Sequence, residues 1–339
     1  PIVDDEDKAA FDLDDSADVR TDVAALTLNW DIEFATLTSI SAYSHYELET
    51  VTNSDFAATP GLHRTKDEDF DQWSQELRLV SPGGETIDWI VGAYYEHSEL
   101  EINRVNTAGD FALSGPLAVQ PLVLSTENPV PTEFDQDNDT FAAFAQLTYS
   151  LTDRVRVTGG LRYHDESKDL DKQTFNDAGA RAADTGPAAN IIVKGRPRDG
   201  AIISDLRSHE WQGLDRDKDK WTWSLNTQWD ATDDAMLYAS FSTGFKSGGF
   251  DEAYSGAGEV IRLTDDILTG EPNGQTIPGA DASILGYDDE TVISYEVGAK
   301  MGLLEGAAEL NIAVFRSEYD DLQTSSLVGD VFRVGNAGE

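Results

Sequence analysis

The chain has 339 residues, with 24 Lys and Arg against 64 Asp and Glu, for a formal net charge of −40. This charge excludes a nucleic-acid partner, because too few cations are present to neutralise phosphates. The absence of cysteine excludes disulfide scaffolds and thiolate chemistry, while 40% hydrophobic residues are too many for a disordered acidic chain.

The N-terminal 22 residues are acidic and contain neither a basic n-region nor an apolar h-region, so they do not resemble a signal peptide. No run of 18 apolar residues occurs anywhere in the chain. The longest uncharged apolar stretch, 111–126, is interrupted by Gly115, Pro116 and Pro121 and would not span a bilayer as a helix. Helical membrane proteins are therefore excluded.

From residue 23 onward, apolar and polar residues alternate with a period of two, which is typical of β-strands. The pattern predicts about eleven strands, most of them longer than the usual ~5–6 residues of globular sheets. They are expected at 23–31, 34–50, 68–80, 86–103, 138–150, 154–170, 218–230, 235–250, 289–301, 306–323 and 331–339.

The links between these strands alternate in length. Short, turn-rich links fall at 31–33, 81–85, 151–153, 231–234 and 302–305. Long links fall between them, at about 51–67, 104–137, 171–217 and 251–288. Such segregation is typical of outer-membrane barrels, which have short periplasmic turns and long extracellular loops.

Aromatic residues share one face of the predicted strands. Trp221, Trp223 and Trp229 alternate with polar residues, and Trp89 and Tyr95 do so in an earlier strand. This placement predicts lipid-facing aromatic girdles. The alternative is an aromatic stripe in the dry core of a large soluble β-protein.

Four segments resemble the TonB-dependent receptors of the Gram-negative outer membrane: WSQELRLVSP at 73–82, YASFSTGFKSGGF at 238–250, SYEVGAK at 294–300 and NIAVFRSEYDDLQ at 311–323. The resemblance implies an all-β, antiparallel transmembrane barrel of about 22 strands. It further implies a plug domain, contact with outer-membrane lipid, and import of a small-molecule solute with energy from the inner-membrane TonB complex.

The chain contains neither a plug domain nor an energy-coupling box, and its last predicted strand does not end on an aromatic residue. We therefore expect about half of such a barrel. Residues 1–22 are expected to form an acidic extracellular loop segment, and residues 23–339 a partial barrel. Contact with the TonB complex would then pass through a plug outside this chain.

Motifs of catalysis are missing from the sequence. It contains no phosphate-binding loop, no dinucleotide glycine fingerprint and no HExxH, and its five histidines lack ligand spacing. The sequence thus predicts neither an enzyme nor a cofactor.

Two groups of residues are candidates for binding. Basic side chains on the polar strand face would line the lumen and either pair with acidic groups there or attract an anionic solute: Arg154, Arg156, Arg162, Lys246 and Arg78. Carboxylates in the segment DQDND, Asp135, Asp137 and Asp139, offer oxygen ligands for Ca²⁺, or form a solvated loop edge.

The leading hypothesis is an energy-coupled receptor that imports a scarce nutrient, such as siderophore-bound iron, a vitamin or a glycan. Two alternatives remain open at this point. One is a passive, porin-like channel, and the other is a soluble β-rich binding or adhesive module.

Overall fold

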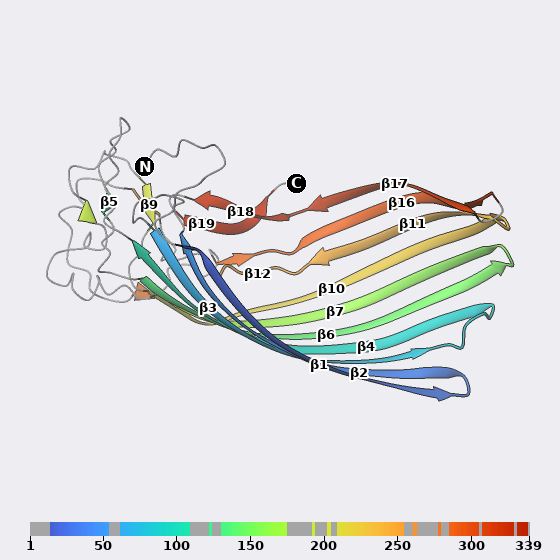
Figure 1. The fold of residues 1–339 in the computed structure, drawn as a ribbon, viewed down its shortest axis with the longest axis horizontal. Coiled ribbons are helices and arrows are strands. Elements are labelled where there is room, and N and C mark those ends of the chain that lie inside the picture. The colour runs from blue at the N-terminus through green and yellow to red at the C-terminus, as the bar shows by residue number, and fades with distance from the viewer. Residues whose placement is uncertain are drawn as a thin grey trace.

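The computed structural model describes residues 14–53, 62–108, 122–123, 130–174, 192–193, 202–204, 209–253, 260–262, 277–278, 285–304, 307–328 and 331–337. These residues form an all-β structure (Figure 1). Within them, no helix has the length and apolar character needed to cross a membrane.

Ten long strands carry the fold: β1 (Ser16–Ile32), β2 (Ala35–Asn53), β3 (Leu62–Val80), β4 (Ile87–Ala108), β6 (Val130–Thr152), β7 (Val155–Thr174), β10 (His209–Thr232), β11 (Ala235–Lys246), β16 (Glu290–Leu303) and β17 (Ala308–Asp320). The shorter strands are β5 (Leu122–Val123), β8 (Ile192–Val193), β9 (Ile202–Ser204), β12 (Gly249–Phe250), β13 (Val260–Arg262), β14 (Ile277–Pro278), β15 (Gly286–Tyr287), β18 (Leu322–Val328) and β19 (Val331–Ala337).

The ten long strands form one antiparallel sheet in the order of the chain, and β14 joins it by pairing with the start of β10. The short links all lie at one end of this sheet, for example between Ile32 and Ala35, which are direct partners. The strand ends that the long links join lie at the opposite end (Figure 1). The predicted segregation of short and long links is therefore confirmed.

The sheet is open in the described part of the chain. There β1 pairs with β2 alone and β17 pairs with β16 alone, and the two lie at opposite margins of the sheet (Figure 1). The last predicted strand does not join the sheet. Instead, β19 forms a separate hairpin with β18 at the end that carries the long links.

Several predicted boundaries differ from the structure. Strands extend farther toward the long links than expected, and β1 begins at Ser16, inside the segment expected to be a loop. Two predicted strands are too long: 235–250 ends at Lys246, and 306–323 breaks at Asp321, which has a positive φ of 55°. The extensions were missed because most residues on both of their faces are polar, so they carry little alternation of hydrophobicity.

One face of the sheet is covered in part by another segment of the chain. Residues 247–253 and 285–289, which we call the inner segment, lie against one face, and we call this face inner. Buried apolar side chains from β4, β6, β7 and β10 pack there with Leu285 of the inner segment: Ile102, Phe134, Leu170 and Trp211. This small core lies near the end of the sheet that carries the long links.

A bulge in β10 supplies one of those core residues. The register between β10 and β7 shifts between Trp211 and Leu214, and Gly213 has a φ of +62°. Glycine adopts this left-handed conformation without steric cost. The bulge turns Trp211 toward the inner face, although alternation along β10 would place it on the outer face.

Candidate solute-binding site

At the end of the sheet that carries the long links, the β11–β16 hairpin separates from its neighbour β10. Pairing between β10 and β11 stops at Ser224 and Ser242, whereas β11 and β16 stay paired as far as Lys246 and Glu290. The ring of Phe245 meets that of His164 on β7, with centroids 5.1 Å apart. The hairpin end therefore bends over the inner face and brings the inner segment there.

A glycine allows this close approach. A Cβ atom on Gly248 would lie 2.2 Å from the carbonyl oxygen of Tyr287 and 2.4 Å from Nη2 of Arg216. Real Cβ atoms do not approach other atoms this closely, so a larger residue would displace Tyr287 or Arg216 and disturb the packing of the inner segment on the sheet. The two parts of the inner segment are joined by backbone pairing, since Asp251 N donates to the Leu285 carbonyl at 2.8 Å.

Six basic side chains of the sheet contact or face the inner segment, and we call them the cationic cluster: Lys66 on β3, Arg104 on β4, Lys168 and Lys172 on β7, and Arg216 and Lys220 on β10. Strand register brings them together. Lys66 is the direct partner of Arg104, and Lys168 is the direct partner of Arg216.

Half of the cluster holds the two residues that follow β12, Asp251 and Glu252. Arg104 Nη1 forms an ion pair with Glu252 at 2.9 Å, and Lys66 Nζ lies 3.8 Å from the same carboxylate. Lys172 Nζ donates to the carbonyl oxygens of Asp251 and Glu252, at 2.8 and 3.1 Å. The Asp251 carboxylate in turn accepts from Val334 N of β19, which ties the C-terminal hairpin to the same place.

The other half of the cluster holds Asp289. Its carboxylate accepts from Arg216 at 2.6 Å, pairs with Lys220 at 3.2 Å and accepts from the Gly248 amide at 3.0 Å. Burial opposes ionisation of Asp289, but the Gly248 amide and the two cations outweigh it and lower the pKa of this carboxyl. Lys168 Nζ completes the contact by donating to the Gly248 carbonyl at 2.7 Å.

The centre of the cluster has unused hydrogen-bonding capacity. The Arg104 side chain is 1% exposed, and within the described ranges its Nε and Nη2 atoms have no hydrogen-bond partner. Burial, with Arg104 adding to it, lowers the pKa of Lys172 from 10.5 to about 7, although Asp251 and Glu252 oppose the shift. A buried guanidinium with free N–H groups beside a buried lysine can bind a further anionic or carbonyl oxygen.

The arginines predicted from β7 have partners within the chain. Arg154 pairs with Asp233 at 2.9 Å in the neighbouring turn, and Arg156 pairs with Asp230 at 3.1 Å. Arg162 lies over the ring of Phe144, with its Cζ atom 5.8 Å from the centroid. Thus two of the three take part in pairing within the sheet, and Arg162 stays a prediction as a solute contact.

The other two predicted basic residues lie outside the cationic cluster. Arg78 pairs with Glu76 at 3.3 Å and lines an open recess of about 570 Å³ near the short turns. Lys246 is exposed where β11 ends, and its carbonyl accepts from Gln323 at 3.4 Å.

Sequence reasoning missed the cationic cluster because its residues come from four strands, and four of the six, Lys66, Arg104, Lys172 and Arg216, lie in polar extensions beyond the predicted strand ends. Most of the cations have acidic neighbours in the sequence, as in DRDKDK at 215–220, so the sequence reads as a solvated loop. The signal that would have found them is the continuation of strand register beyond the apolar band. Extending β7 by two steps from Lys168 places Lys172 on the same face.

The predicted aromatic residues share the outer face in pairs that cross strands. Tyr95 meets Trp73 at 5.0 Å between centroids, and Trp221 meets Tyr163 at 5.0 Å. Trp223 stacks on Phe241 at 4.4 Å. Trp229 is exposed at the end of β10 near the short turns, and Trp89 occupies the comparable end of β4.

The acidic residues Asp135, Asp137 and Asp139 lie within β6, not in a loop. Alternate residues of a strand lie about 6.7 Å apart, so the first and third are too far apart to share one ion. Asp139 instead accepts hydrogen bonds from Tyr95 at 2.5 Å and pairs with His97 at 3.1 Å. The three carboxylates therefore do not form the Ca²⁺ site that their sequence spacing suggested.

Comparison with known proteins identifies the family in which this architecture occurs. The family model described as TonB dependent receptor-like, beta-barrel, matches residues 3–339. The ferric yersiniabactin uptake receptor FyuA from Yersinia pestis superposes with a TM-score of 0.63 at 18% identity, over 95% of this chain and 38% of that one.

Two other solved structures show the same fold. The ferric-catecholate import receptor Fiu from Escherichia coli K12, in its closed form, has a TM-score of 0.55 at 15% identity, over 96% of this chain and 44% of that one. The siderophore receptor PiuA from Acinetobacter baumannii has the same TM-score and identity, over 96% of this chain and 43% of its own. The chain thus spans less than half the length of these structures, and it belongs to the TonB-dependent receptor family, within the β-barrel part.

Proposed function

We propose that this chain is part of the barrel of an outer-membrane receptor that imports a small anionic solute, such as an iron chelate, with energy from the TonB complex. In this proposal the outer face contacts lipid and the inner face lines the lumen. The remaining strands and a plug domain belong to other parts of the protein, and residues 1–22 lie on the extracellular side.

The observation that carries the proposal is the cationic cluster. In a chain with a net charge of −40, six cations converge on the inner face. The centre of the cluster is a buried arginine, two of whose nitrogens have no hydrogen-bond partner in the part of the chain that the structure describes. The carboxylates that meet this cluster, Glu252 and Asp289, belong to the inner segment and occupy the positions that an anionic solute would take. Low local dielectric strengthens such contacts.

The distribution of charge over the two faces supports the same reading. Beyond the aromatic row of the outer face, cross-strand neighbours are acidic, as in Asp71 opposite Glu99 and Glu99 opposite Asp137. An anionic solute is therefore repelled from the flank and attracted to the lumen. Field focusing of this kind raises the rate at which a charged ligand reaches its site.

The structure disfavours one of the two alternatives. In a soluble module the aromatic stripe would form a dry core, but Trp221, Trp223 and Trp229 are all exposed on the outer face. A passive channel remains the second candidate, and the inner segment argues against it because an acidic segment fastened over the inner face narrows an open pore.

Uptake by cells tests the proposal. Cells that express the intact protein from its own gene are given radiolabelled iron on chelators of negative, zero and positive net charge, with and without a protonophore. We expect an anionic chelate to be taken up. This uptake should stop when the protonophore removes the proton gradient and when the gene is deleted. Uptake that persists with the protonophore would favour a passive channel.

A further inference from the structure

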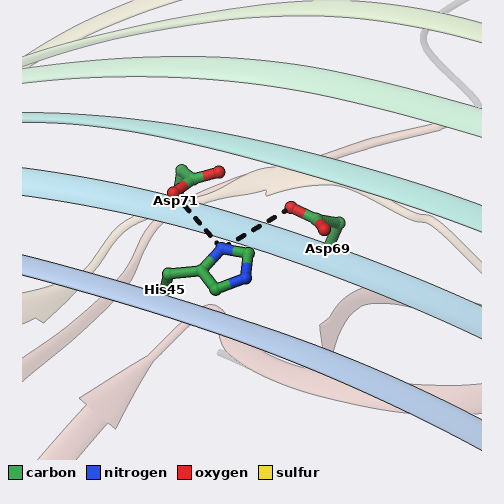
Figure 2. Close-up of side chains that lie close together, drawn as sticks. All are labelled: His45, Asp69 and Asp71. Carbon is green, nitrogen blue, oxygen red and sulfur yellow. Dashed lines mark ion pairs between the residues drawn. The ribbon is translucent and has the colours of Figure 1, made fainter. Parts of the chain in front are cut away.

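A second polar cluster lies on the outer face, one step beyond Tyr43 and Trp73. It consists of His45 on β2 and of Asp69 and Asp71 on β3, whose carboxylates both approach the same imidazole nitrogen (Figure 2). The three ligand atoms lie within 4.8 Å of one another. Register explains the grouping, because His45 and Asp71 are direct partners in the sheet.

The distances from His45 Nδ1 to the two carboxylate oxygens suit atoms that share a metal ion better than a hydrogen bond. His45 Nδ1 lies 3.3 Å from Asp71 Oδ1 and 3.9 Å from Asp69 Oδ1. This nitrogen is buried and, among the residues that the structure describes, has no hydrogen-bond partner despite the nearby carboxylates. Neighbouring ligand atoms of a tetrahedral Zn²⁺ ion, each about 2.1 Å from the metal, lie about 3.4 Å apart.

The cluster also has an uncompensated negative charge. In the described part of the chain, no lysine or arginine forms an ion pair with Asp69 or Asp71. Carboxylates approach from both sides: Glu47 lies 3.7 Å from His45 Nε2, and Glu99 on β4 is the direct partner of Asp71. On β1, Asp22 opposes His45, and Arg20 pairs with Asp22 and Glu47 instead.

Asp71 is held in place by a neighbour outside the cluster. The Tyr43 hydroxyl donates to Asp71 Oδ1. Hydrogen bonds of this kind orient a ligating carboxylate in metal sites. Like charges directly opposite each other destabilise a sheet, so a bound cation would remove a cost that this arrangement otherwise carries.

The neighbouring strand pair provides a contrast. His97 on β4 also has ligand atoms of Glu99 and Asp137 within 4.8 Å on the outer face, but both of its ring nitrogens are hydrogen-bonded, Nδ1 to Asp139 at 3.1 Å and Nε2 to Glu99 at 3.2 Å. That arrangement suits a charged imidazolium that itself compensates the carboxylates. His45 lacks such hydrogen bonds at Nδ1 and keeps this nitrogen available.

We propose that His45, Asp69 and Asp71 bind one divalent transition-metal ion, of which Zn²⁺ is the most suitable. Imidazole is a ligand for Zn²⁺, whereas Ca²⁺ and Mg²⁺ prefer oxygen alone. Three protein ligands leave a fourth position for water. The site lies on the face opposite the cationic cluster, so it is independent of the proposed transport.

Calorimetric titration of the intact protein in detergent with Zn²⁺ tests this proposal. Excess Mg²⁺ is included so that diffuse binding to acidic groups is suppressed. The variants are His45→Ala and Asp71→Asn, with His97→Ala as the matched control because it removes the same residue type from the same face. Zinc K-edge absorption of the loaded protein reports whether imidazole is a ligand, and circular dichroism confirms that each variant is folded.

We expect one saturable site that survives Mg²⁺, that weakens by about tenfold or more in His45→Ala and Asp71→Asn, and that is unchanged in His97→Ala. The imidazole signal of the loaded protein should be absent in His45→Ala. Displacement by Mg²⁺, equal weakening in the His97 control, or a zinc spectrum with oxygen ligands alone would overturn the proposal.

Discussion

Replacing Glu252 by Gln should release the inner segment from the sheet. Arg104 is buried, and its ion pair at 2.9 Å with Glu252 compensates the charge. Breaking a buried pair on one side costs about 3–5 kcal/mol, because the other charge stays buried. Glu252 is partly exposed and glutamine keeps one acceptor oxygen, so we expect the low end of that range, about 3 kcal/mol.

Amide hydrogen exchange of the intact protein in detergent measures this effect. A loss of about 3 kcal/mol corresponds to a roughly hundredfold increase in the opening equilibrium. The amides to follow are those of Gly248 and Asp251, whose hydrogen bonds to Asp289 and to the Leu285 carbonyl lie within the inner segment. Both residues are buried while the segment lies against the sheet, so its release exposes these amides to solvent. Exchange in the rest of the sheet, for example along the β1–β2 hairpin, should not change.

Asp233→Asn is the matched control. Its carboxylate pairs with Arg154 at the same distance of 2.9 Å, but both side chains are exposed, at 90% and 54%. Exposed pairs contribute little to stability, so exchange should be nearly unchanged in this variant. Unaltered exchange at Gly248 and Asp251 in Glu252→Gln, or an equal change in the control, would refute the reasoning.

Three further predictions follow from the same structure. Leu225→Arg, midway along the outer face of β10 between Trp221 and Trp229, should cost about 2–4 kcal/mol in urea unfolding from lipid vesicles, and Asn226→Arg on the opposite face should cost much less; equal costs would contradict the assignment of the faces. Gly248→Ala should free a spin label at Ala253→Cys, since the chain has no native cysteine, and an immobile label would show that the sheet tolerates the added Cβ. Closure of the inner segment should become more favourable as pH rises from about 7 to 10.5, because over that range Lys172 binds a proton in the open state but not in the closed state. At acidic pH, below the ordinary carboxyl pKa of 3.8, closure should become less favourable as Asp289 is protonated. If label mobility in Lys172→Met has the same pH profile as in the parent, the Lys172 prediction is wrong.

Sequence reasoning predicted the strands well where one face is apolar. The alternation from Trp221 to Trp229 fixed the face of β10, because a shift of one residue would move every apolar side chain to the other face. The ends of the same strands were missed, since 209–217 has polar residues on both faces. There the strand is held by pairing with β7, which alternation does not reveal.

The candidate site was harder to predict for a related reason. The arginines of β7 were found because they interrupt an apolar pattern, and Arg154 and Arg156 turned out to pair with nearby acidic residues. Arg104 and Lys172 are functional candidates because the hairpin of β11 and β16 bends over them. That bend depends on the missing β10–β11 pairing beyond Ser242, a tertiary feature without a local sequence signal.

Equilibrium binding to the intact receptor tests the central claim most directly. The affinity for the anionic iron chelate identified by uptake is measured for the parent protein, for Arg104→Gln in the cationic cluster and for Arg154→Gln at the turn end, as a function of salt. Loss of a hydrogen-bonded charge should weaken binding by about 10- to 100-fold in Arg104→Gln, with a smaller salt dependence, and leave Arg154→Gln unchanged. Equal affinity in all three proteins would contradict the assignment of the cationic cluster as the solute site.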